Sequence, residues 1–179
     1  MRTVAILCAA TKSYYHDMPG VDVYDARRDA RTFGGGMPVV AHPPCRSWSA
    51  FTAHQSKPED GERNLGLWCA EQVKREGGIL EQPAHSRLWE AANLPRPGQP
   101  ASRDGFSLEV WQAWWGYSMK KNTWLFFSHI DQAAIHLPFT LHAKGADRRR
   151  EQIMSKRQRA ETIPALARWL VELARTATP

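Results

Sequence analysis

The chain contains several short runs of apolar residues in which polar residues do not alternate. Residues 4–9 read Val-Ala-Ile-Leu-Cys-Ala, and residues 38–42 read Pro-Val-Val-Ala-His. Uninterrupted runs of this length are typical of central strands that are covered on both faces, as in a parallel sheet. Residues 21–25, 78–81 and 122–128 predict three further strands, each next to a glycine, proline or asparagine.

Helical spacing of apolar residues predicts helices between and after these strands. Residues 60–76 have this spacing, and residues 163–175 form a strongly amphipathic segment with Pro164 in its first turn. A short helix is predicted within residues 86–92. Residues 106–115 are rich in aromatic side chains and are compatible with a strand or a helix.

The order of these elements predicts one α/β domain that spans residues 1–179. A length of 179 residues fits a single domain, and 42% hydrophobic residues can form a substantial core. No internal repeat or linker interrupts the pattern. Strands that alternate with helices indicate a mostly parallel sheet flanked by helices.

The charge of the chain favours a polyanionic partner. The formal net charge is +6 and the sequence pI is about 9.5. Residues 143–162 are crowded with basic side chains, including Arg148 and Arg149, and we expect this segment to be exposed and able to hold phosphates. A solvated charged helix is the alternative interpretation of the same segment. The charge therefore permits a nucleic-acid partner, and a protein that is merely basic is the alternative. The oligomeric state stays open.

Cysteine content and hydropathy indicate the compartment. The three cysteines have no CxxC spacing, which argues against a disulfide framework and against a zinc site. No apolar run approaches the roughly 20 residues that span a bilayer. We therefore expect a cytoplasmic protein without a membrane segment.

Chemistry is most strongly indicated where the predicted strand 38–42 ends. Pro43 and Pro44 make the chain rigid there, and Cys45 follows at the carboxyl edge of the sheet, where α/β proteins bind ligands. Glu81 ends another predicted strand in the same way, and Lys121 precedes the strand at 122–128. A structural cysteine in a proline loop is the alternative.

Four segments, taken in order, extend this observation. Residues 43–49 read Pro-Pro-Cys-Arg-Ser-Trp-Ser, and Glu81 is followed by Gln-Pro. Trp115-Gly116 forms a turn ahead of Lys121, and Ile163-Pro164 opens the last helix. The series resembles the cytosine carbon-5 DNA methyltransferase family, and in particular short, phage-type members. That family has a Pro-Pro-Cys loop followed by Gln, any residue, Phe and Ser; here Arg replaces Gln and Trp replaces Phe.

The resemblance implies a Rossmann-like fold and covalent catalysis. Cys45 would add as a thiolate to carbon 6 of cytosine, which makes carbon 5 nucleophilic. Glu81, with a pKa raised by burial, would donate a hydrogen bond to ring nitrogen 3. Lys121 would steady the ring carbonyl or the thiolate, and Arg46 would help to ionise the thiol. Ser49 would order the loop.

Two neighbours of this motif receive structural interpretations. Trp48 is expected to fill the core rather than to stack on a base. His42 has no partner at metal-ligand spacing and is expected either to be structural or to support a neighbouring site residue, and no metal site is predicted.

The cofactor is the point at which the chain departs from the family. S-adenosylmethionine is the implied methyl donor, but the family's glycine-rich loop after the first strand is replaced by Ala-Thr-Lys-Ser-Tyr. A loop without glycine approaches a ligand less closely, which leaves another donor open. Asp22 or Asp25 would hold a ribose, and Asp29 would lie near the adenine.

Three functions remain open at this level. The first is carbon-5 modification of cytosine in DNA. The second is the same chemistry on a free pyrimidine nucleotide, because residues 128–162 are too few for the family's target-recognition domain. The third is a catalytically silent relative that binds DNA or a protein.

Overall fold

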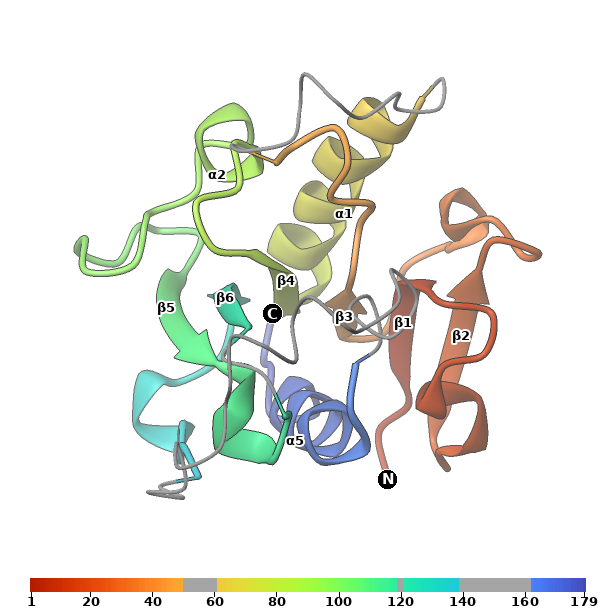
Figure 1. Ribbon diagram of the computed structural model, residues 1–179. Coiled ribbons are helices and arrows are strands. Elements are labelled where there is room, and N and C mark those ends of the chain that lie inside the picture. The colour runs from red at the N-terminus through yellow and green to blue at the C-terminus, as the bar shows by residue number, and fades with distance from the viewer. Residues whose placement is uncertain (50–60, 119–120, 139–161) are drawn as a thin grey trace.

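Six strands form one mixed sheet in the order β2-β1-β3-β4-β6-β5 (Figure 1). The structure is a computed structural model that describes residues 1–49, 61–118, 121–138 and 162–179. The strands are β1 (Val4–Ala9), β2 (Val21–Asp25), β3 (Val39–Ala41), β4 (Gly78–Pro83), β5 (Phe106–Trp111) and β6 (Asn122–Ser128). The described helices are α1 (Glu62–Glu76), α2 (Leu88–Ala91) and α5 (Pro164–Ala174), with 3-10 turns η1 (Tyr14–Asp17), η2 (Ala30–Thr32), η3 (Gln112–Trp115) and η4 (Gln132–Ala134).

The first four strands are parallel and form the buried half of the sheet. The central register aligns Ile6 of β1 with Val40 of β3, and Val40 with Ile79 of β4. These three side chains have no exposed surface. This arrangement explains why nearly all residues of β1, β3 and β4 are apolar, because both faces of these strands are covered.

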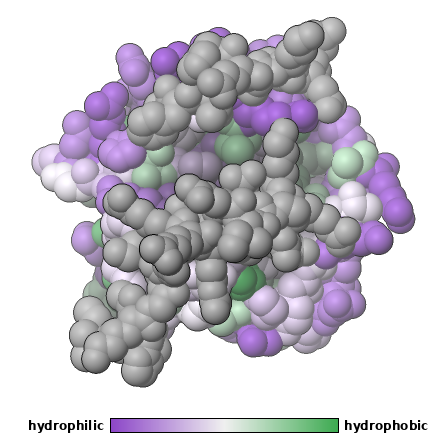
Figure 2. Space-filling model, in the orientation of Figure 1, coloured by the Kyte–Doolittle hydropathy of each residue, from purple (hydrophilic) through white to green (hydrophobic). Residues whose placement is uncertain are grey.

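Helices cover the two faces of the sheet separately. One face packs Ile6, Val40 and Ile79 against α5, and the other packs alternate residues of the same strands, such as Leu7 and Leu80, against α1 and α2. Figure 1 shows α1 (yellow) and α5 (blue) on opposite sides of the sheet. The visible surface is mostly hydrophilic at its periphery, and hydrophobic residues appear mainly in recesses (Figure 2).

The direction of β6 makes the sheet mixed. β5 and β6 pair antiparallel, from Phe106 opposite Phe127 to Trp111 opposite Asn122, and β6 also pairs antiparallel with β4. The connection between β5 and β6 is η3 and a left-handed Gly116, which is too short for a parallel crossover. As a result, the start of β6 lies beside the end of β4.

The α/β fold with a mostly parallel sheet and flanking helices, predicted from the sequence, is confirmed. Each predicted strand is present, and the ambiguous segment 106–115 divides into strand β5 and turn η3. The helix at the C-terminus is α5, with Pro164 at its start. The basic segment 143–162 lies outside the described residues except for Thr162.

None of the helices in the described part of the chain combines the length and the apolar character needed to cross a bilayer.

Candidate functional site

Two adjoining cavities open at the carboxyl ends of the parallel strands. Between β1 and β3 the strand order reverses, because β2 lies on one side of β1 and β3 lies on the other. In open α/β sheets, ligands bind outside the strand ends at such a point. The two cavities meet there and share Cys8, Ala9 and Pro44 as lining residues.

The first cavity has a volume of about 280 Å³ and brings the predicted catalytic residues together. Cys45 follows β3, Glu81 is on β4, and Lys121 comes just before β6. Lys121 reaches this edge only because β6 is antiparallel to β4. Cys45 is exposed to solvent. The lining consists of Cys8, Ala9, Ala10, Ser13, Tyr15, His42, Pro43, Pro44, Cys45, Glu81, Gln82, Pro83, Lys121 and Thr162.

Hydrogen bonds and one buried indole hold the loop that carries Cys45. The Gln82 side-chain amide donates to the carbonyl of Pro43. The Trp48 backbone N–H donates to the carbonyl of Cys45 over 3.0 Å, and Arg87 N–H donates to the carbonyl of Trp48 over 2.9 Å. Trp48 is 1% exposed, which confirms the expectation that its ring fills the core. The thiol is therefore presented from a loop that is fixed at both ends.

Glu81 lies in a chain of hydrogen bonds that the sequence did not reveal. Its carboxylate is nearly buried, with Oε2 at 3.2 Å from Nδ1 of His42. Nε2 of His42 lies 2.9 Å from the hydroxyl of Tyr15. On the other side, Nε2 of Gln112 donates to Oε1 of Glu81 over 3.1 Å and to Thr123 over 3.0 Å. Both oxygens of Glu81 thus have fixed partners.

Of the two interpretations of His42, the supporting one fits the structure, since its ring contacts Glu81 and lines the cavity. The signal in the sequence was a histidine directly before Pro-Pro-Cys. Tyr15 and Gln112 had no such signal, because they come from η1 and η3, far away along the chain.

The electrostatics of Glu81 contradict the expectation of a raised pKa. Burial raises the pKa of Glu81, but the positive charge of Lys121, the contact with His42 and the hydrogen bond from Gln112 together outweigh it. The pKa of Glu81 is therefore lowered, and the carboxyl is ionised at neutral pH. The prediction from sequence considered burial alone and did not include the charge and hydrogen bonds of Lys121, His42 and Gln112.

Cys45 shows the opposite balance. Surrounding protein atoms desolvate the thiol, and the nearby Glu81 carboxylate repels a thiolate, so the pKa of Cys45 is raised even though Lys121 opposes the change. Arg46, predicted to help ionise the thiol, forms an ion pair with Glu62 at the first turn of α1. Of the two cations predicted to favour the thiolate, Lys121 does lower the pKa of Cys45, but it does not outweigh burial and the charge of Glu81.

The second cavity, of about 350 Å³, lies between β1, β2 and η2. Asp25 and Asp29 line it, and Asp22 does not. The Asp25 carboxylate accepts backbone N–H bonds that form the turn after β2, and it is buried. Asp22 instead pairs with Arg28 and Tyr24. Of the two predicted ribose ligands, only Asp25 therefore faces a cavity.

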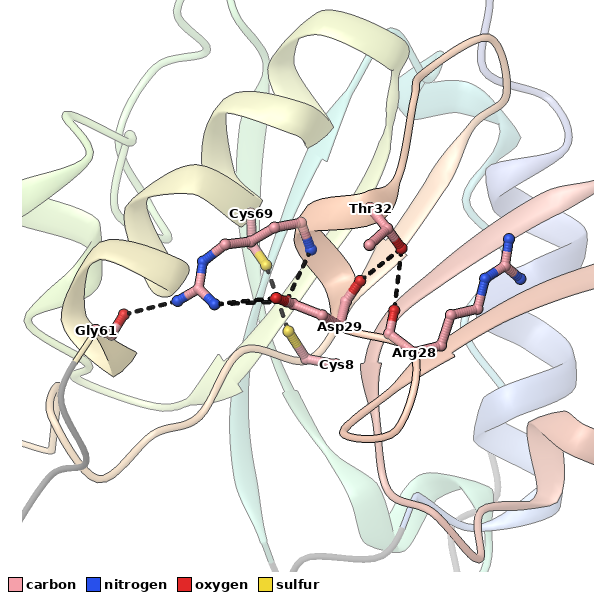
Figure 3. Close-up of polar contacts among 7 residues, drawn as sticks. Cys8, Arg28, Asp29, Thr32, Gly61 and Cys69 are labelled. Carbon is pink, nitrogen blue, oxygen red and sulfur yellow. Dashed lines mark hydrogen bonds and ion pairs between the residues drawn. The ribbon is translucent and has the colours of Figure 1, made fainter.

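Cys8 lies at the junction of the cavities. Its φ of 61° is in the left-handed region, at an irregularity in the pairing of β1 with β2. Its sulfur lies 3.6 Å from that of Cys69 on α1, and Figure 3 shows the two thiols facing each other. The Asp29 carboxylate in turn pairs with Arg31, whose guanidinium reaches the carbonyl of Gly61. These contacts link β1, η2 and α1 around the second cavity.

The remaining predicted site residues lie elsewhere. Pro43 and Pro44 line the first cavity, while Arg46 and Ser49 do not. Arg148 and Arg149 fall outside the described residues.

A scan against protein-family models and searches of curated proteins and of solved structures each found no match to this chain.

Proposed function

We propose that this chain is a DNA cytosine carbon-5 modifying enzyme, similar to a methyltransferase, with Cys45 as its nucleophile. The observation that carries the proposal is the meeting of Cys45, Glu81 and Lys121 in one cavity at the carboxyl edge of the sheet. A thiol, a carboxyl group and a cation are the groups that addition to a pyrimidine ring requires.

Each of the three residues has a separate role in this proposal. The Cys45 thiolate adds to carbon 6 of the ring. Glu81, when it carries a proton, donates a hydrogen bond to ring nitrogen 3. His42 and Gln112 fix its position. Lys121 is close enough to affect the pKa values of both Cys45 and Glu81, and its charge stabilises the thiolate and the ring carbonyl.

The second cavity supports S-adenosylmethionine as the donor in a Rossmann-like domain. Asp25 and Asp29 offer carboxylate oxygens, which suit ribose hydroxyls and a cationic amino acid group, and the volume is in the range of small-molecule sites. The shared residues Cys8, Ala9 and Pro44 place this cavity directly beside that of Cys45. The cofactor would supply the methyl group, and this chain would orient it with Asp25.

DNA as the partner is supported by the net charge of +6. A target base in a duplex would have to leave the stack to reach Cys45. The basic segment 143–162, with Arg148 and Arg149, is proposed to hold the phosphates during this step.

Mass spectrometry for a covalent adduct tests the proposal. The full chain is incubated with DNA that contains 5-fluorocytosine, with and without S-adenosylmethionine. Fluorine at carbon 5 blocks the final elimination, so we expect a stable adduct that needs the cofactor. Cys45→Ala should abolish it, whereas Cys69→Ala, the matched control at a buried thiol, should not. The absence of an adduct from the wild-type chain would overturn the proposal, and an adduct on the free nucleotide alone would change the substrate.

Binding of the cofactor has its own test. Calorimetry with S-adenosylmethionine should detect binding to the wild-type chain and much weaker binding to Asp25→Asn, since amide nitrogen replaces one carboxylate oxygen. Asp22→Asn is the matched control, because Asp22 does not line the cavity.

A further inference from the structure

The addition needs Cys45 as a thiolate and Glu81 with a proton. Their neighbours favour the opposite, a protonated Cys45 and an ionised Glu81. Glu81 is held as a carboxylate by its neighbours, and that negative charge opposes ionisation of Cys45. Addition of sulfur to carbon 6 pushes electrons onto ring nitrogen 3, which then needs a proton. A proton must therefore reach Glu81 from another group in the cavity.

We propose that His42 is a positioning residue that delivers this proton to Glu81, and that Tyr15 holds the His42 ring in the orientation for the transfer. The inference rests on the proposed function and goes beyond it, because neither His42 nor Tyr15 has an assigned role there. It is carried by the continuous path from Tyr15 through both ring nitrogens of His42 to Glu81.

The titratable groups that line the same cavity as His42 include Tyr15 from η1, Glu81 from β4, Cys45 from its own loop and Lys121 before β6. Among the described residues, the side chains that hydrogen-bond to Glu81 are His42, at 3.2 Å, and Gln112, whose amide does not transfer a proton. Burial raises the pKa of Tyr15 well above its ordinary value, so the phenol keeps its proton. Imidazole is the side chain that gains and loses a proton near neutral pH.

The environment of His42 also fixes which nitrogen serves which partner. Nδ1 faces the Glu81 carboxylate, and Nε2 faces the hydroxyl of Tyr15. The imidazolium form donates at both nitrogens, while the neutral form after transfer keeps its proton on Nε2 and donates it to the Tyr15 oxygen. The ring therefore stays in place before and after the transfer. His42 N–H also donates to the carbonyl of Leu7 over 2.9 Å, which fixes the backbone.

The step balances as follows. The exposed Cys45 thiol gives its proton to solvent water, and its sulfur lone pair forms the bond to carbon 6. The carbon 5–carbon 6 π pair moves to carbon 5–carbon 4, and the carbon 4–nitrogen 3 π pair moves onto nitrogen 3. Nitrogen 3 takes a proton from Glu81, and Glu81 takes the Nδ1 proton of the His42 imidazolium. The products are the covalent adduct, the Glu81 carboxylate, neutral His42 and one proton released to the solvent.

Nuclear magnetic resonance tests the coupling without any substrate. The seven histidines are labelled with ¹³C and ¹⁵N, and His42 is assigned by the signal that disappears in His42→Asn. In Glu81→Gln an amide replaces the carboxylate that faces Nδ1, so the ¹⁵N chemical shifts of the His42 ring nitrogens, which report where the ring protons lie, should change. His136→Gln, on an exposed loop, should leave them unchanged. Identical His42 ring-nitrogen shifts in wild type and Glu81→Gln would overturn the proposal.

The pH profile of adduct formation then tests the role in the reaction. His42→Asn keeps a donor to Glu81 but cannot carry a proton, so the rate should fall about 100-fold or more and the shape of the pH profile should change. Tyr15→Phe removes the partner that orients the His42 ring and should cause a smaller loss of rate. A wild-type rate and profile in His42→Asn would refute the role of His42. No adduct in the wild-type chain refutes the proposed function instead, while the ring-nitrogen shifts still decide the His42–Glu81 coupling.

Discussion

At the scale of single residues, neighbours decide the chemistry of Cys45 and Glu81. Both side chains are at the carboxyl edge of the sheet, yet the pKa of Glu81 is lowered and that of Cys45 is raised. Lys121 favours the ionised form of both groups, and the two negative charges oppose each other. The ionised form is favoured for Glu81 and not for Cys45, because His42 and Gln112 also donate hydrogen bonds to Glu81. The protonated form of the Cys45 thiol is therefore favoured.

This balance predicts the alkylation rate of Cys45. Since the pKa of Cys45 is raised, iodoacetamide should modify it slowly at pH 7.5 and faster as the pH rises past 9. Glu81→Gln removes the repulsion, so its midpoint should fall, with about a tenfold gain in thiolate per unit of pKa. Lys121→Met should move the midpoint upward. Peptide-resolved mass spectrometry separates Cys45 from the other two cysteines.

The control for this experiment is Lys12→Met, because Lys12 is exposed and does not line the cavity. Equal alkylation profiles for wild type and Glu81→Gln would show that Glu81 does not control the thiol.

At the scale of elements, helix α1 supports the Cys45 loop through the contact of Trp48 with Gly66. A Cβ atom at Gly66 would lie 2.3 Å from Nε1 of Trp48, closer than atoms can approach. Arg63 stacks over the same indole, with its guanidinium carbon 5.0 Å from the ring centre. The glycine in the middle of α1 is therefore explained by the close approach of this ring.

Gly66→Ala is expected to destabilise the protein and loosen the loop. Alanine should favour the helix by about 1 kcal/mol at an open position, but overpacking against Trp48 costs about 1–3 kcal/mol. We expect a lower free energy of unfolding in urea and a faster alkylation of Cys45. Asn64→Ala, at an exposed position of α1, is the matched control. A stabilised Gly66→Ala protein would contradict the packing of Trp48 on α1.

At the scale of the whole molecule, the net charge bears on the proposed binding to DNA. The +6 charge predicts binding to duplex DNA that weakens as salt increases, because bound phosphates release counterions. Replacing Arg148 and Arg149 with alanine should lower the slope of log K against log salt by about 0.9 for each phosphate that the variant no longer neutralises. Fluorescence anisotropy from 50 to 200 mM salt measures this slope.

The matched control is Arg103→Ala, since Arg103 is an exposed arginine in the loop before β5 that lines neither cavity. An unchanged slope in the Arg148 and Arg149 variant would remove the basic segment from the proposed interface.

Much of the fold could be predicted from the sequence because it depends on local patterns. The apolar runs at β1 and β3, the spacing in α1 and the proline start of α5 each specify an element by themselves. The same reasoning predicted that Cys45 and Glu81 share one edge if their strands are neighbours, since parallel strands end at the same edge. These inferences need only the spacing of apolar residues and the positions of glycine and proline along the chain.

The sequence by itself determined the α/β layering and placed Cys45 and Glu81 each at the end of a strand. Only the tertiary structure decided that these two strands are neighbours, that β6 is antiparallel and brings Lys121 to the site, and that His42 is the partner of Glu81. It also decided that Asp25 rather than Asp22 faces a cavity. The physical reason is that pairing direction, burial and charge balance depend on groups distant in sequence, which a local pattern does not contain.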